Sequence, residues 1–209
     1  MNLNVDDQLS SVTRAVSYTE RDGRPTSVVT LARSFPARVD NLWDAITSAN
    51  RLPRWFMPVS GDLQPGGRFQ LEGNAGGTIV TCLRRSRLGV TWEFAGDVSW
   101  VEVRFVREGA GRARFTLSHE ALLSPHWDEF GPGAAGVGWE MGLLGLSLHL
   151  AQPDAPKIDE EEFAASPEGR ALVVGSSDGW AQASIDAGDD PEAARAAAAR
   201  TAAFYTSAG

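Results

Sequence analysis

The stretch "LGVTWEF", residues 88–94, alternates large apolar side chains with small or polar ones. Successive side chains of a strand point to opposite faces, so the apolar residues of this stretch share one face. They are Leu88, Val90, Trp92 and Phe94. A period of two is typical of a strand that buries one side. The stretch therefore predicts a sheet with one apolar face, which another element has to cover.

Similar short segments lie on both sides of this stretch, with no helical pattern between them. They are "GDLQPGGRFQLEG" (61–73), "GGTIVTCLRR" (76–85), "SWVEVRFVRE" (99–108) and "RARFTLSHEAL" (112–122). Short strands in succession, separated by Gly, Arg and Asp turns, predict an antiparallel meander. Residues 12–35 add a hairpin, because Asp22-Gly23 between two β-rich runs is a strong turn signal.

Two short helical segments precede the meander. Val39, Leu42, Trp43 and Ile46 recur at the spacing of an amphipathic helix. The stretch "LPRWFMP", residues 52–58, follows it and carries two adjacent aromatic rings between two prolines. Proline resists helix interiors, so we expect a short 3₁₀ turn there. We interpret its aromatic pair as the closure of a hydrophobic cavity.

The segment "GVGWEMGLLGLSLHL", residues 136–150, predicts the long helix that covers the sheet, because Trp139, Leu143, Leu146 and Leu150 keep helical spacing. Its interior glycines, Gly138, Gly142 and Gly145, each cost about 1 kcal/mol relative to alanine. Two explanations stay open. The helix backbone packs closely against the sheet, or the missing side chains leave room for a ligand.

The composition changes after residue 155, and residues 156–209 predict a helical extension to a main domain of residues 1–155. The extension is rich in alanine and carries three large aromatic residues, Trp180, Phe204 and Tyr205. We expect these to dock on the main domain or on a second copy, which makes the extension a candidate homodimer surface.

Charge and cysteine content exclude several classes of function. The chain has 209 residues and a formal net charge of −8, and an acidic surface repels nucleic acid. No apolar run reaches the roughly 18 residues that a membrane span needs. The first residues, "MNLNVDDQLSSV", are unlike a secretory signal, and Cys82 is the single cysteine. We therefore expect a cytoplasmic protein without disulfides.

Five segments, in this order, resemble the START-like or SRPBCC superfamily, in the branch named after the activator of the heat-shock protein 90 ATPase. They are "FPARVDNLWDAITSANRLPRWF" (35–56), "GDLQPGGRFQL" (61–71), "LGVTWEF" (88–94), "TLSHEAL" (116–122) and "GVGWEMGLLGLSLHL" (136–150). The resemblance covers roughly residues 28–150. The sequence departs from it at Phe56, where the family usually has a second tryptophan, and over residues 153–209.

The resemblance implies an α+β helix-grip fold, in which a curved antiparallel sheet wraps a long helix and two short helices close one end. It also implies an apolar cavity, as in polyketide cyclase-related proteins of this superfamily. Relatives mostly bind small hydrophobic molecules, a few catalyse cyclisation or hydrolysis of them, and the founding co-chaperone contacts a protein. We expect a binder of a small hydrophobic or aromatic molecule rather than an enzyme. The alternatives are a cyclase or hydrolase on the same cavity and a co-chaperone-like module with a role in the stress response.

The candidate cavity-wall residues are the large apolar side chains of the predicted sheet, closure and long helix, together with one histidine. They are Trp55, Phe56, Phe69, Trp92, Phe94, Phe115, Leu117, His119, Trp139 and Leu143. Plain core packing would bury the same residue types. His119 lies on the apolar face and matches a strand-end histidine of the family. It could donate a hydrogen bond to a ligand or act as a general base, with Thr91 or Ser118 as further polar contacts at the rim.

Two further motifs lack the context that their chemistry needs. "GPGAAG", residues 131–136, fits the dinucleotide pattern G-x-G-x-x-G, but no βαβ unit surrounds it and Pro132 removes an amide. "HWDEF", residues 126–130, offers two metal-ligand types without a third, and we expect it to form a loop over the cavity mouth. We therefore expect no cofactor, no metal and no catalytic residue.

Overall fold

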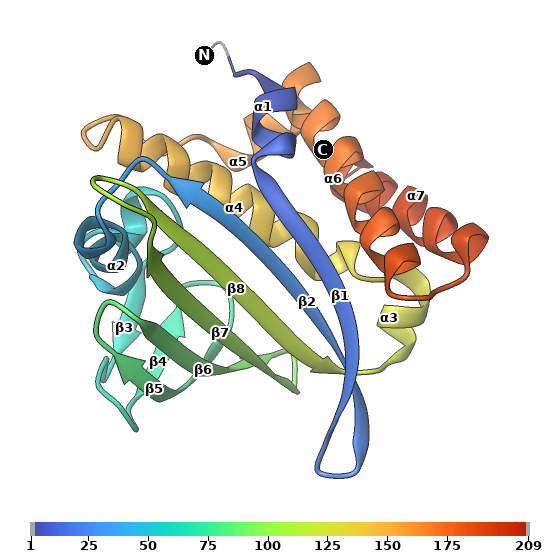
Figure 1. Ribbon diagram of the computed structural model, residues 1–209, viewed down its shortest axis with the longest axis horizontal. Helices are drawn as coiled ribbons and strands as arrows, with labels where there is room; N and C mark the ends of the chain where they lie inside the picture. The colour runs from blue at the N-terminus through green and yellow to red at the C-terminus, as the bar shows by residue number, and fades with distance from the viewer. Residues whose placement is uncertain (1–2, 208–209) are drawn as a thin grey trace. The chain divides into compact units, whose positions relative to one another are not determined.

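The computed structural model describes residues 3–207, and their strands form one eight-stranded sheet in the order β1-β2-β8-β7-β6-β5-β4-β3 (Figure 1). The strands are β1 (Val12–Arg21), β2 (Arg24–Phe35), β3 (Val59–Gly61), β4 (Arg68–Leu71), β5 (Gly76–Leu83), β6 (Arg87–Phe94), β7 (Asp97–Arg107) and β8 (Ala113–Leu122). From β3 to β8 each strand pairs antiparallel with the next in sequence, which confirms the predicted meander.

The helices of the described residues agree with the sequence pattern at most positions. They are α1 (Val5–Ser10), α2 (Val39–Thr47), the 3₁₀ helix η1 (Leu52–Arg54), α3 (Pro125–Phe130), α4 (Gly133–Ala151), α5 (Glu160–Ala165), α6 (Pro167–Asp186) and α7 (Pro191–Ser207). An antiparallel sheet with two short helices before the meander and a long helix after it is a helix-grip arrangement. The predicted fold class is therefore confirmed.

Three local expectations were wrong or incomplete. Residues 126–130 belong to α3 and not to a loop, because Ser124 caps the segment by accepting a hydrogen bond from the amide of Trp127 at 3.4 Å. The long helix begins at Gly133, so four of the six residues of the glycine-rich stretch 131–136 are already helical. Helix α1 was not predicted at all, and it is only six residues long.

The chain groups into two compact units, which we describe separately. The first, called the helical unit, comprises residues up to Leu31, Leu122–Leu144 and residues from Ile158. The second, called the sheet unit, comprises Ala32–Ala121 and Gly145–Lys157. The domain boundary that the sequence suggests after residue 155 stays a prediction.

The C-terminal extension docks inside the helical unit, as its aromatic residues predicted. Trp180 of α6 is fully buried and its indole ring lies against Gly136 of α4. The hydroxyl of Tyr205 on α7 donates to the carbonyl of Ala134 at 2.8 Å. Phe204 is the exception, since it is 60% exposed. Helices α6 and α7 run side by side in this unit (Figure 1).

A buried ion pair ties the N-terminal strand to the long helix within the helical unit. The guanidinium of Arg14 on β1 donates to both carboxylate oxygens of Glu140 on α4, at 2.7 and 2.6 Å. The two side chains are 12% and 4% exposed. Bidentate geometry offsets part of the desolvation cost of such a buried pair.

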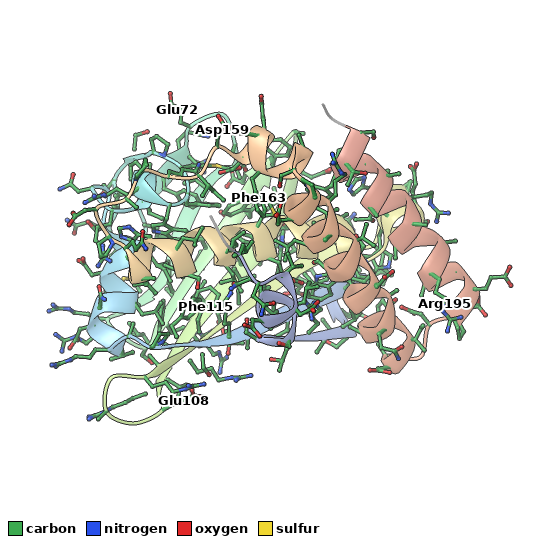
Figure 2. The ribbon with its side chains drawn as sticks, turned by 90° about the horizontal axis from the view of Figure 1, so that it is seen from above. Glu72, Glu108, Phe115, Asp159, Phe163 and Arg195 are labelled. Carbon is green, nitrogen blue, oxygen red and sulfur yellow. The ribbon has the colours of Figure 1, made fainter. Side chains whose placement is uncertain are left out.

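The core of the sheet unit contains a row of aromatic rings. Phe115 of β8, labelled in Figure 2, packs edge-on against Phe35 and Phe105, with ring centroids 6.4 and 6.0 Å away. Trp43 of α2 contacts Phe105 at 5.3 Å. This row joins helix α2 to the sheet.

Candidate functional site

Strands β6, β7 and β8 place one set of side chains on a common face of the sheet. Val101 of β7 is the register partner of Val90 on β6 and of His119 on β8. Trp92 of β6 is opposite Ser99 of β7. Register partners of an antiparallel sheet project to the same face. His119 and Ser99 therefore share the face of Val90 and Trp92.

An apolar cluster covers this face at its β4–β6 end. Its buried members are Phe69, Leu71 and Ile79, and its partly buried members are Phe56, Met57, Val59, Cys82, Leu88, Val90 and Trp92. Most of these side chains are large, yet more of them are partly exposed than buried. A sealed core would bury them, so the cluster presents accessible apolar surface.

The two aromatic residues after η1 have different roles. Trp55 is buried, and its indole nitrogen donates to the carbonyl of Ala45 on α2 at 2.9 Å. Phe56 stacks on Trp55 with ring centroids 5.4 Å apart, and it packs against the apolar cluster. Trp55 is thus an anchor held by a hydrogen bond, whereas Phe56 contributes the accessible surface.

Gly145 of α4 lets the long helix pack directly against the segment that follows η1. A Cβ atom at Gly145 would lie 2.5 Å from the backbone oxygen of Trp55, too close for any other residue. This glycine therefore permits close backbone packing. Of the two explanations that the sequence left open, close approach holds here, although the partner is the segment after η1 and not the sheet.

His119 is part of a hydrogen-bonded chain that ends on the backbone. Its Nε2 lies 2.8 Å from the hydroxyl oxygen of Ser99, and that hydroxyl donates to the carbonyl of Trp92 at 3.1 Å. A serine hydroxyl has a single proton to donate. Nε2 of His119 is therefore the donor to Ser99, and the neutral ring carries its proton there. The His119 ring also meets the Trp92 ring at 6.4 Å.

Burial lowers the pKa of His119 to about 4, so the ring is neutral at neutral pH. The side chain nevertheless keeps part of its surface accessible. His119 is therefore mostly but not fully buried, beside the Trp92 ring.

The structure brings together some of the predicted wall residues and separates others. Phe56, Phe69 and Trp92 belong to the apolar cluster, with His119 on the same face and Trp55 behind Phe56. Phe115 and Leu117 are 4% and 3% exposed and lie in the core. Phe94 is 55% exposed beside the β6–β7 turn, so we leave it out of the wall. Trp139 is half-buried and Leu143 buried in the helical unit, and their place in a cavity stays a prediction.

Ser99 is the polar site residue that sequence reasoning missed. Thr91 and Ser118, suggested as polar contacts at the rim, lie on the opposite face, since their register partners are Trp100 and Glu102. Counting residues back from the Ala95-Gly96 turn would have placed Ser99 opposite Trp92. Both turn residues have positive φ, which is typical of a two-residue hairpin loop.

A second histidine lies at the end of α4. Nε and Nη2 of Arg51 approach Nε2 of His149 at 3.3 and 3.1 Å, and His149 is 5% exposed. A guanidinium only donates, so Nε2 of His149 accepts and its proton is on Nδ1. Nδ1 has no hydrogen-bond partner among the described residues. Burial and the neighbouring charge of Arg51 lower the pKa of His149, which keeps this contact intact at neutral pH.

Other site chemistries find little support within residues 3–207. No three His, Cys, Asp or Glu side chains of this part of the chain come together as metal ligands. None of its helices combines the length and apolarity needed to cross a membrane.

The sequence profile of the family described as "Activator of Hsp90 ATPase homolog 1-like protein" matches residues 36–150. The chain belongs to this family. No curated protein matches the chain.

Solved structures of other proteins agree with this membership. The solution structure of CalU16 from Micromonospora echinospora is 31% identical, with a TM-score of 0.69, and the match covers 84% of this chain and 96% of CalU16. PFC0360w, an HSP90 activator from Plasmodium falciparum, is 22% identical with a TM-score of 0.53, covering 59% and 96%. DynU16, from the dynemicin biosynthetic locus, is 22% identical with a TM-score of 0.55, covering 63% and 50%. The last two similarities concern the fold alone.

Proposed function

We propose that this member of the family binds a small hydrophobic or aromatic molecule on the face formed by the apolar cluster and the Ser99–His119 pair. The observation that carries the proposal is that Phe56, Val90 and Trp92 are partly exposed apolar side chains of one cluster, and that Trp92 lies beside a desolvated, neutral histidine. Apolar walls with a few convergent polar groups are typical of small-molecule sites.

The test is binding of N-phenyl-1-naphthylamine, an uncharged dye that fluoresces strongly in apolar surroundings. We expect saturable binding to the wild-type protein and an affinity at least about fivefold lower for Phe56→Ala, because the variant loses buried contact area. Phe204→Ala is the matched control: the same change at a side chain that is 60% exposed and belongs to the helical unit should leave binding unchanged. Absence of saturable dye binding to the folded wild-type protein would overturn the proposal.

An enzyme on the same face is the second candidate, since Ser99 and His119 are 2.8 Å apart, the separation of a nucleophile and its base. Two observations favour binding instead. The Ser99 hydroxyl donates to the carbonyl of Trp92 and not to the ring, and a pKa of about 4 makes His119 a weak base at neutral pH. Turnover of 2-naphthyl acetate that disappears in Ser99→Ala would favour the enzyme.

Cytoplasmic location, a role in the stress response and dimerisation through the extension remain predictions. A co-chaperone role would appear as a change in the ATPase rate of a purified chaperone of the heat-shock protein 90 family.

A further inference from the structure

The polar groups on the proposed binding face are few, and strand register identifies them. Between the charged ends of β7, at Asp97 and Arg107, alternate residues of this strand that share the Trp92 face are apolar except for Ser99. The same count along β8 leaves His119 as the polar residue of that face. A ligand on this face meets these two side chains as its polar contacts from β7 and β8.

Neither group carries a charge at neutral pH. Ser99 is neutral by nature, and burial holds the pKa of His119 near 4. A carboxylate or ammonium group placed beside them would lose its hydration without gaining an opposite charge, which is costly in an apolar site. A hydroxyl group loses less hydration and can donate a hydrogen bond to Oγ of Ser99, which accepts from His119 and has a second lone pair.

The hydrogen-bond chain also makes the pair rigid. Nε2 of His119 donates to Ser99, and Ser99 donates to the Trp92 carbonyl, so both side chains are oriented before a ligand arrives. The Trp92 ring lies beside the His119 ring, with centroids 6.4 Å apart. A ligand that contacts the Trp92 ring therefore lies beside the polar pair.

We infer that the Ser99–His119 pair makes the site selective for uncharged aromatic molecules that carry a hydroxyl group, and that it discriminates against their carboxylate and ammonium counterparts. This inference rests on the proposed function and specifies the class of ligand.

Four probes with the same ring system test the inference: naphthalene, 2-naphthol, 2-naphthoate and 2-(aminomethyl)naphthalene, each competing with N-phenyl-1-naphthylamine at pH 7. For the wild-type protein we expect 2-naphthol to bind about fivefold more tightly than naphthalene, the value of one net hydrogen bond. The two charged probes should bind at least about tenfold more weakly than 2-naphthol.

Substitutions of Ser99 and His119 test whether this pair causes the selectivity. In Ser99→Ala, 2-naphthol and naphthalene should bind with about equal affinity. The affinity for naphthalene should stay at the wild-type value. Ser118→Ala is the matched control, because the same change lies on the opposite face of the sheet. His119→Leu should act like Ser99→Ala, and if it does not fold, Ser99→Ala alone decides the matter.

The outcomes separate the two proposals. If the dye binds but 2-naphthoate competes as well as 2-naphthol, or Ser99→Ala keeps the full selectivity, the inference is overturned and the proposed function stands. If neither the dye nor naphthalene binds, the proposed function fails and the inference fails with it.

Discussion

At the scale of single residues, His119 links the site to the pH dependence of folding. Its pKa of about 4 in the folded protein lies below the value near 6.5 of an unfolded histidine. Below pH 6.5 the unfolded chain therefore binds a proton that the folded chain does not, and stability falls as the pH falls. This contribution is fully present above pH 6.5 and is lost by about pH 4.

We predict that His119→Leu flattens this dependence. Between pH 6.5 and 4 the wild-type protein should lose about 3 kcal/mol more of its free energy of unfolding than the variant does. Urea denaturation at a series of pH values measures the difference. His126→Gln, at an exposed position of α3, is the control and should keep the wild-type slope. Equal slopes for His119→Leu and the wild-type protein would contradict the burial of His119.

His149 also makes the folded protein less stable as the pH falls, because burial and the charge of Arg51 lower its pKa as well. Its protonation in acid would bring two cations together at the Arg51 contact. The segment before η1 is then held less tightly to α4. The slope that remains in His119→Leu should therefore decrease further when His149 is also replaced.

At the scale of elements, the glycines of α4 show how one helix meets different neighbours. Gly136 has the indole ring of Trp180 directly against it, and Gly145 has the backbone of Trp55. Sequence alone shows glycines that weaken a helix, with no indication of what replaces the missing side chains. The neighbour at each glycine comes from a distant part of the chain, so only the folded protein explains the pattern.

We predict that Gly136→Ala destabilises the protein although alanine favours helices by about 1 kcal/mol over glycine. The new methyl group would overlap the buried Trp180 ring, and such overpacking typically costs about 1–3 kcal/mol or more. Gly138→Ala is the control in the same helix, because a Cβ atom there meets just the hydroxyl oxygen of Tyr205, at 3.0 Å. If Gly136→Ala melts at a higher temperature than Gly138→Ala, the Trp180 ring does not pack against Gly136 as described.

At the scale of the whole molecule, the C-terminal extension forms part of a compact unit with β1 and the first half of α4. Trp180 is fully buried there, and the Arg14–Glu140 pair lies in the same unit. The extension therefore contributes to folding and is more than an appended tail.

We predict that Trp180→Ala costs about 3–5 kcal/mol of stability, which lowers the melting temperature by roughly 6–20 °C in a chain of this size. Phe204→Ala, at a side chain that is 60% exposed in the same extension, should change it by a few degrees at most. A chain that ends at residue 155 and melts at the wild-type temperature would contradict this role of the extension.

The sequence by itself determined most elements of this protein and their order, with α1 and α3 as the exceptions. The period of two in β6, the Asp22-Gly23 turn and the prolines around η1 are local signals, because backbone sterics and side-chain alternation act over a few residues. They led to the meander, the hairpin and the 3₁₀ turn, and the family resemblance implied the helix-grip fold. Tertiary structure alone decided that Phe94 stays largely exposed although it shares the face of Trp92, and that Trp55 is an anchor. Register and packing join residues far apart in the chain, and apolar side chains of a core and of a binding site are the same residue types until their neighbours are known.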